Sequence, residues 1–219
     1  MINRMGFNNE GLEAFAGRLE ARRGRTGVVG ANIGANKDSA DRIGDYVDGL
    51  RRLWRLADYF TVNISSPNTP GCATFSPVRP GRIAGARRRG SPRGGDERPA
   101  AAARPIFLKV APDLRELQII AICDAVARHG FEGIIAGNTT LSRPDTLRSK
   151  LRDETGGLSG APLMSLSTRV LADFHACAAG RFPLIGAGGV ASGADAYAKI
   201  RAGACAVQVY RRSSMADRA

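Results

Sequence analysis

Amide and hydroxyl side chains gather between Thr61 and Gly71, where the sequence reads T-V-N-I-S-S-P-N-T-P-G. The first half of this stretch is rich in β-forming residues and predicts a buried strand. Pro67 and Pro70 lack a backbone N–H and therefore end that strand. The polar groups thus follow the carboxyl end of a strand, where α/β folds bind their ligands. They are Asn63, Ser65, Ser66, Asn68 and Thr69. The alternative interpretation is a turn held by Asn and Ser side chains.

Other predicted strands also end in groups that could bind a ligand. Lys109 lies in the hydrophobic segment F-L-K-V, and a lysine on a buried strand needs a partner or a ligand. A snorkelling lysine or an internal ion pair is the alternative. Glycines at 186–189 and 156–160 can bring backbone N–H groups close to a phosphate. We expect the strand ends to meet at one mouth. The groups at these ends are Asn32, Asn63 with Ser66, Lys109, Asn138, Gly188 with Gly189, and Tyr210.

Alternating strands and helices must position these groups. Apolar runs predict strands at 27–33, 59–64, 106–110, 133–136, 183–185 and 206–210. Apolar residues at helical spacing predict helices over 9–24, 39–54 and 113–130, and helices that begin at Ser167 and Ser192. We expect Asn9, Ser39, Asp113 with Glu116, and Ser192 to cap helix starts. Strands that are followed by helices indicate parallel pairing through right-handed crossovers.

Five motifs resemble, in the same order, the quinone-linked class of dihydroorotate dehydrogenases, in which the catalytic base is a serine. They are N-R-M-G-F-N-N at 3–9, N-I-S-S-P-N-T-P-G at 63–71, F-L-K-V-A-P-D at 107–113, N-T-T at 138–140 and G-G-L-S-G at 156–160. The resemblance covers residues 2–71 and 104–210, and it implies a (β/α)8 TIM barrel. Because six strands are two short, we expect an incomplete barrel whose missing strands would precede Met1. The family's N-terminal helical extension, with its quinone site and membrane contact, is expected to be missing as well.

The resemblance implies a dihydroorotate site and an FMN site within a partial barrel domain at 1–210. The residues implied for dihydroorotate or orotate are Asn3, Arg4, Met5, Gly6, Phe7, Asn63, Asn68, Asn138 and Thr139. The residues implied for FMN are Asn32, Asn63, Lys109, Gly137, Gly160, Gly188, Gly189 and Tyr210. Ser66 would remove the C5 proton of dihydroorotate while the C6 hydride passes to the flavin, with Thr69 relaying the proton through a water.

Two positions depart from the family pattern. The family usually has Thr or Ser where Gly137 stands, and a serine that helps hold the phosphate where Arg211 stands. His129 and His175 fall on predicted crossover helices, and we assign them no catalytic role. The four cysteines are scattered without a C-x-x-C pair, which suits a reducing cytosol, and we assign no metal ligand.

The net charge of +12 is concentrated in two unusual segments. Residues 72–104 hold eight arginines against Asp96 and Glu97, and residues 211–219 hold three arginines against Asp217. The first segment has few large apolar residues where a crossover helix is expected, and its composition indicates disorder. We interpret both segments as reading-frame slips in a GC-rich gene. The alternative is a genuine basic insertion that contacts nucleic acid or acidic lipid.

The sequence therefore predicts FMN-dependent oxidation of dihydroorotate to orotate in pyrimidine biosynthesis, with electrons passed to a quinone and no nucleic-acid partner. The resemblance implies a peripheral location on the cytoplasmic side of the inner membrane, although no apolar run of about 18 residues anchors this chain. Two alternatives stay open. One is an inactive fragment that binds no cofactor, and the other is a flavin barrel that oxidises a different cyclic amide.

Overall fold

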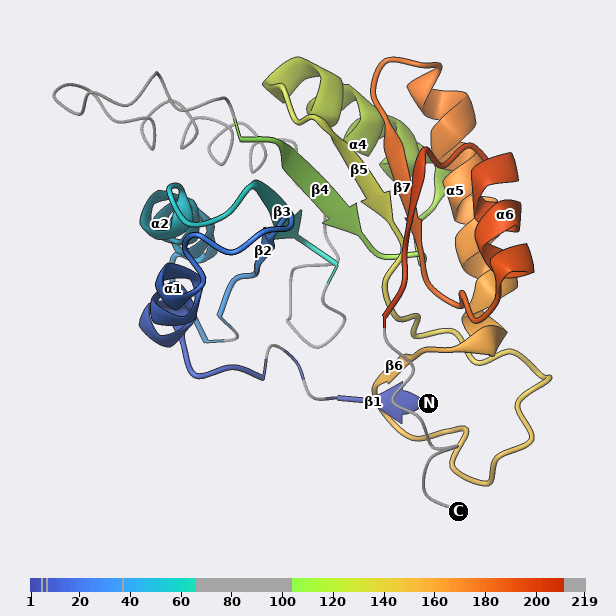
Figure 1. Cartoon of the computed structure of the whole chain (residues 1–219). Helices are drawn as coiled ribbons and strands as arrows, with labels where there is room; N and C mark the ends of the chain where they lie inside the picture. The colour runs from blue at the N-terminus through green and yellow to red at the C-terminus, as the bar shows by residue number, and fades with distance from the viewer. Residues whose placement is uncertain (5, 7, 37, 66–103, 211–219) are drawn as a thin grey trace, which may run out of the picture.

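A six-stranded parallel sheet forms the centre of the protein (Figure 1). The computed structural model describes residues 1–4, 6, 8–36, 38–65 and 104–210. The strands follow one another in chain order across the sheet, as the predicted right-handed crossovers require. They are β2 (Gly30–Ile33), β3 (Tyr59–Asn63), β4 (Ile106–Val110), β5 (Gly133–Ala136), β7 (Leu184–Ala187) and β8 (Ala206–Gln208). All six correspond to predicted strands, with shorter bounds at 27–33 and 206–210.

The helices lie along the outside of this sheet (Figure 1). They are α1 (Leu12–Ala21), α2 (Arg42–Leu53), α4 (Glu116–His129), α5 (Met164–Ala178) and α6 (Gly193–Arg201), with a short 3-10 turn, η1 (Ala161–Leu163), before α5. Apolar side chains from the helices and strands form one continuous core between them. Phe60 of β3, Leu108 of β4 and Phe174 of α5 are almost fully buried in it. Burial of this surface is the main force that holds the helices on the sheet.

The sheet is curled, as a contact between side chains of non-adjacent strands on one face shows. Lys109 Nζ of β4 donates a hydrogen bond of 2.9 Å to Gln208 Oε1 of β8. Two strands, β5 and β7, lie between them, so a flat sheet would hold β4 and β8 about 14 Å apart. The bond requires the strands to curve around a shared interior, as in part of a barrel.

A second, two-stranded sheet was not predicted. The short strand β1 (Ile2–Asn3) pairs antiparallel with β6 (Gly157–Leu158), so Ile2 faces Leu158 and Asn3 faces Gly157. Two residues are too few to give a periodic hydrophobic signal. The pairing places the first residues of the chain beside the loop that contains G-G-L-S-G, and Figure 1 shows β1 next to β6.

Several predicted helix starts are wrong by a few residues. The first helix begins at Leu12 with Gly11 as its N-cap, while Asn9 Oδ1 accepts a hydrogen bond from Gly11 N. The second is capped by Asp41 rather than Ser39, because the Asp41 carboxylate accepts from Gly44 N at 3.0 Å.

Among the later helix starts, the predictions for α4 and α5 are wrong and the prediction for α6 is confirmed. Helix α4 is capped at Arg115 through Gln118, since the carboxylate of Asp113 instead binds the loop after β5 at Leu141 and Ser142. Helix α5 begins at Met164, which places Ser167 inside it. The predicted cap at Ser192 is confirmed, because its hydroxyl accepts from Asp195 N at 3.1 Å.

The two unusual basic segments fall outside the described residues, apart from Arg104. In the part of the chain that the structure describes, each helix is too short or too polar to cross a membrane.

Candidate active site

The ends of β3 and β5 carry a linked set of polar side chains, Asn63, Ser65 and Asn138, here called the amide cluster. Asn63 and Ser65 are buried. Asn63 Oδ1 accepts hydrogen bonds from Ser65 N at 3.1 Å and from Ser65 Oγ at 2.5 Å. Asn138 Nδ2 donates to Ser65 Oγ across the width of β4. The bond from Ser65 N is the turn considered as the alternative, and it coexists with the contact between strand ends.

Contacts from behind hold the amide cluster in place. Tyr46 Oη of α2 donates to the backbone oxygen of Asn63 at 2.8 Å. Asn138 Oδ1 accepts from Thr139 N at 2.8 Å, which fixes the amide orientation of Asn138. With both carboxamides held in this way, the cluster presents hydrogen-bonding groups in a fixed geometry and carries no net charge.

The sheet of β1 and β6 brings the N-terminal motif toward the amide cluster. Asn3 pairs with Gly157, and a Cβ on Gly157 would lie 2.1 Å from Thr139 Oγ1. Asn3 and Thr139 therefore lie on either side of a strand that has room only for glycine. Arg4 points elsewhere, because its Nη1 donates to Glu154 Oε2 at 3.0 Å and to the backbone oxygen of Thr155 at 2.9 Å.

Lys109 supplies a cation to the interior of the curled sheet. Asn63 and Lys109 are register partners on neighbouring strands, so this lysine lies next to the amide cluster. Its partner in the described part of the chain is the neutral amide oxygen of Gln208, and no described carboxylate forms an ion pair with it. Burial lowers the pKa of Lys109, since desolvation disfavours the ammonium form. The internal ion pair considered as an alternative is therefore not seen among the described residues, and an electron-rich ligand could stabilise the ammonium.

Glycines allow the loops after β5 and β7 to approach their neighbours closely. Gly137 has a φ of 125°, and a Cβ there would lie 2.2 Å from the backbone oxygen of Ala187. The pair Gly188 and Gly189, here called the glycine turn, has φ values of 93° and 80°. A Cβ on Gly189 would lie 2.6 Å from the backbone nitrogen of Met164. The glycine turn is thus packed against the start of α5, close to η1, whose N-cap is Gly160.

Other predicted site residues are not gathered into this group by the structure. Tyr210 lies beyond β8 with 97% of its side chain exposed, and Gln208 is the β8 residue that reaches the interior. Asn32 is exposed on β2 beside Thr61, and Gly6 is exposed with a φ of 64°. Several predicted positions lie outside the described residues, namely Met5, Phe7, Ser66, Asn68, Thr69 and Arg211.

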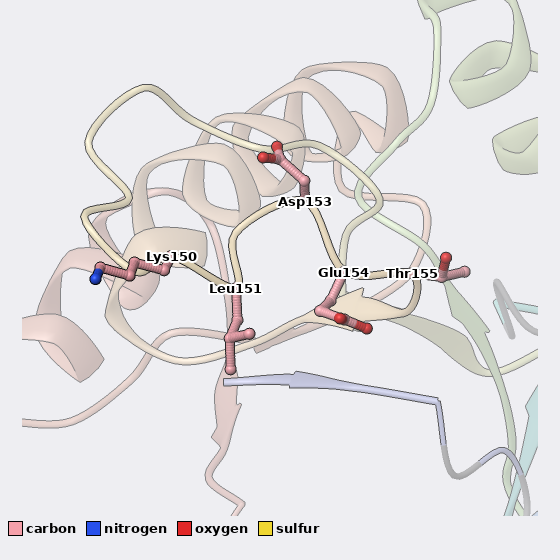
Figure 2. Close-up of a pocket in the computed structure, with 5 residues that line it drawn as sticks. All are labelled: Lys150, Leu151, Asp153, Glu154 and Thr155. Carbon is pink, nitrogen blue, oxygen red and sulfur yellow. The ribbon is translucent and has the colours of Figure 1, made fainter.

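A separate pocket of about 310 Å³ lies in the loop between β5 and β6, away from these groups (Figure 2). It is lined by consecutive or nearly consecutive residues, which are Lys150, Leu151, Asp153, Glu154 and Thr155. Figure 2 shows the Lys150 and Asp153 side chains pointing away from each other, so the pocket has no converging set of polar groups.

Comparison with known proteins identifies the family. The family model described as dihydroorotate dehydrogenase matches residues 1–218. The chain belongs to the dihydroorotate dehydrogenase family. Curated relatives named dihydroorotate dehydrogenase (quinone), from Xanthobacter autotrophicus and Azorhizobium caulinodans, are each 50% identical to it. Each match covers 96% of this chain and 59% of the relative, so the chain spans about three fifths of their length.

Solved structures of this family confirm the fold. The dihydroorotate dehydrogenase of Eimeria tenella in complex with ferulenol is 38% identical, with a TM-score of 0.87 over 95% of this chain and 61% of that chain. Its ligand-free form is 39% identical, with a TM-score of 0.86 over 95% and 63%. The curled sheet is therefore an incomplete (β/α)8 TIM barrel, as predicted, and the resemblance to the quinone-linked class is confirmed.

Three residues that contribute to these contacts were not predicted from the sequence. Ser65 was noted in its motif without a role, yet it joins Asn63 to Asn138. Gln208 was not predicted: strand alternation places it on the same face as Tyr210, but β8 ends at Gln208 and only Gln208 bonds to Lys109. Arg143 was also missed. It donates to the backbone oxygens of Arg152, Glu154 and Gly156, and so shapes the loop that leads to β6.

The residues present fit a flavin phosphate ester. Lys109 is a partly buried cation with a neutral partner, and the glycine turn leaves no space for a side chain between its backbone and α5. A large planar ligand with an anionic tail needs such a combination of charge and accessible backbone.

Proposed function

We propose that this chain binds FMN and takes part in the oxidation of dihydroorotate to orotate in pyrimidine biosynthesis, with electrons passed to a quinone. The family membership and the names of its relatives support the reaction. The observation that carries the proposal is the convergence of the amide cluster and Lys109 on the concave side of the sheet.

The amide cluster suits a pyrimidine ring. Dihydroorotate shows alternating N–H donors and carbonyl acceptors, and carboxamides can match both. Asn63 and Asn138 are proposed to bind the ring, with Asn3 and Thr139 beside them and Asn68 adding a further amide. Because these groups are already fixed by Ser65 and Thr139 N, little conformational entropy is lost when a ligand binds.

Proton removal is proposed for Ser66, which directly follows the buried Ser65. A serine hydroxyl is a weak base, so Ser66 needs a path for its proton, and Thr69 through a water is proposed for that path. The hydrogen bonds of Ser65 to Asn63 and Asn138 support this role indirectly, since they fix the backbone one residue before Ser66.

The cofactor is proposed to be held by Lys109, Asn63, Gly137, Gly160 and the glycine turn. FMN, when bound, would supply the capacity to accept a hydride. The ammonium of Lys109 would stabilise negative charge on the ring, and the backbone N–H groups of the glycine turn would bind the phosphate. Asn32 and Tyr210 keep only the support of the motif resemblance. Peripheral contact with the inner membrane and quinone binding are proposed for the whole enzyme rather than for these residues.

Reduction of bound flavin by substrate tests the proposal. The purified chain is loaded with FMN and mixed anaerobically with dihydroorotate, and the yellow flavin absorbance is followed. We expect the absorbance to bleach, and Asn138→Ala to slow bleaching by at least roughly tenfold through the loss of a fixed amide contact. Asn36→Ala, at an exposed asparagine outside the cluster, should behave as the wild type.

Two results would count against this function. A folded chain that binds no FMN would support the inactive fragment. Bound flavin that dihydroorotate leaves oxidised, while another cyclic amide reduces it, would support the alternative flavin barrel.

A further inference from the structure

A lysine outside the proposed site is completely buried behind the glycine turn. Lys199 of α6 has 0% of its side chain exposed, whereas its apolar neighbours Tyr197 and Ile200 are 63% and 44% exposed. The lysine stem passes over β7 at Gly186, where a Cβ would lie 3.2 Å from Lys199 Cβ and Cδ. A lysine is rarely buried so fully, and its position requires an explanation beyond packing.

Ser167 of α5 accepts a hydrogen bond from Lys199 and connects it to the glycine turn. Lys199 Nζ donates to Ser167 Oγ at 2.6 Å. Ser167 Oγ lies 3.0 Å from the backbone oxygen of Gly188 and 3.1 Å from that of Met164. The path from Lys199 to the turn therefore has two hydrogen bonds and joins α6, α5 and the loop after β7.

The charge on Lys199 sets the direction of the hydroxyl proton. An ammonium has donors and no acceptor, so Ser167 must accept from it and point its own proton at a backbone oxygen, either that of Gly188 or that of Met164. A neutral amine could instead accept a hydrogen bond from the Ser167 hydroxyl. Ser167 would then donate to neither the Gly188 nor the Met164 backbone oxygen. Burial lowers the pKa of Lys199 to about 8, against the opposing effect of Asp195.

Few charges face Lys199 in the described part of the chain. On its own helix, the Asp195 carboxylate acts on it, and that group is also held by Ala191 N and Ser192 Oγ. From α5 and β7 it meets neutral groups, namely Ser167 and Gly186. The ammonium form is therefore the one present at neutral pH, with Ser167 as its hydrogen-bond acceptor.

The glycine turn needs support from behind because it binds through its backbone. Both of its residues have positive φ, and glycine pays a large conformational entropy cost when it is held in one conformation. Because both residues of the turn are glycines, the turn has no side chains of its own that could stabilise its conformation. The hydroxyl of Ser167 is the side-chain contact to the carbonyl of Gly188.

We propose that Lys199 is a positioning residue which, through Ser167, holds the glycine turn in the shape that binds the phosphate of the flavin. This inference rests on the proposed function, because the phosphate is that of FMN. Lys199 touches neither ligand nor reacting atoms, and its effect is carried by two hydrogen bonds.

Matched variants separate positioning from general stability. Lys199→Met keeps the apolar stem and removes the donor, and Ser167→Ala removes the link. Thr168→Ala is the control, since Thr168 Oγ1 bonds Met164 O at 2.8 Å on the same helix without a contact to Gly188. The dissociation constants of FMN and of riboflavin, which lacks the phosphate, are measured by quenching of flavin fluorescence at neutral pH. Hydrogen exchange over residues 186–191 is measured without flavin.

We expect the wild type and Thr168→Ala to prefer FMN, and Lys199→Met and Ser167→Ala to lose roughly tenfold of that preference while binding riboflavin unchanged. Unchanged preference for FMN in Lys199→Met would overturn the inference. A wild type that binds neither flavin would overturn the proposed function instead. Hydrogen exchange would then test the link between Lys199 and the glycine turn separately. Faster exchange in Lys199→Met and Ser167→Ala than in Thr168→Ala supports the link to the turn, and equal exchange refutes it.

Discussion

The amide cluster and the glycine turn both lie at the carboxyl ends of strands in the same sheet. The amide cluster consists of side chains, whereas the glycine turn consists of backbone atoms. The amide cluster uses neutral side chains that bond to one another directly, from Asn63 through Ser65 to Asn138. The glycine turn has no side chains, and its support is a buried charge on a neighbouring helix, acting through Ser167. The first region holds itself in place, whereas the second is held from outside.

This difference determines where substitutions act. In the amide cluster, a changed side chain alters a group that faces the ligand. In the glycine turn, the ligand would meet backbone atoms, so the effective changes are those that add a side chain or remove its external support.

The largest effect is expected for Gly189→Ala. The new Cβ would lie 2.6 Å from the Met164 backbone, which cannot move without shifting α5, and the φ of 80° disfavours alanine. We expect a loss of about 4 kcal/mol in the free energy of unfolding, measured by denaturant titration. Gly193→Ala, in the first turn of α6 with open space around it, should be neutral or slightly stabilising. Equal stability of the two variants would show that the turn is not packed as described.

Lys199 should make stability depend on pH. Its folded pKa of about 8 lies below the ordinary lysine pKa of 10.5, so the folded state binds fewer protons between these values. The free energy of unfolding therefore rises with pH across this window, and the cost of the buried charge is complete below about pH 8. Relative to Lys199→Met, the wild type should gain about 3 kcal/mol between pH 7 and 10.5. Parallel curves for the two proteins would mean that Lys199 titrates normally.

Removal of an amide should have a smaller and more local effect. Asn63→Ala leaves the buried Ser65 N–H and hydroxyl without their acceptor, so we expect a loss of about 2 kcal/mol in the free energy of unfolding. Orotate affinity should fall, and riboflavin affinity should fall with it because Asn63 is also proposed to hold the cofactor, as measured by calorimetry and fluorescence. Asn36→Ala, at an exposed side chain, should stay within about 0.5 kcal/mol of the wild type. Equal losses of unfolding free energy in both variants would contradict the role given to the amide cluster.

The smallest effect is expected for the ion pair of Arg4 and Glu154, which links the residue after β1 to the loop before β6. Their side chains are 64% and 48% exposed, and water screens such pairs. Glu154→Gln should cost about 0.5 kcal/mol or less of unfolding free energy. If Arg4 is released toward the substrate, orotate affinity in this variant should rise. A large loss of stability would instead show that the pair holds β1 against β6.

Sequence patterns predicted the amide cluster better than the support of the glycine turn, for physical reasons. A strand end with Asn63 and Ser65 is visible because strand periodicity and proline both mark it. Lys199 was not visible, since the large apolar residues Tyr197 and Ile200 suggest the opposite face of α6 as the buried one.

One signal could have revealed Lys199. The small residue Ala196 shares a helix face with it, and the small residues Ala202 and Gly203 directly follow the helix, which allows α6 to approach β7 closely. The strand pair β1 and β6 had no comparable signal, because its pairing depends on register between distant segments.

The most direct test of the central claim is equilibrium binding of FMN to the purified chain and to Lys109→Met. The claim is that the strand ends of this partial barrel form one flavin site around Lys109. We expect saturation at one FMN per chain in the wild type and in Lys150→Met, an exposed lysine control, and at least roughly tenfold weaker binding in Lys109→Met. A folded wild type without saturable binding, or Lys109→Met with unchanged affinity, would contradict it.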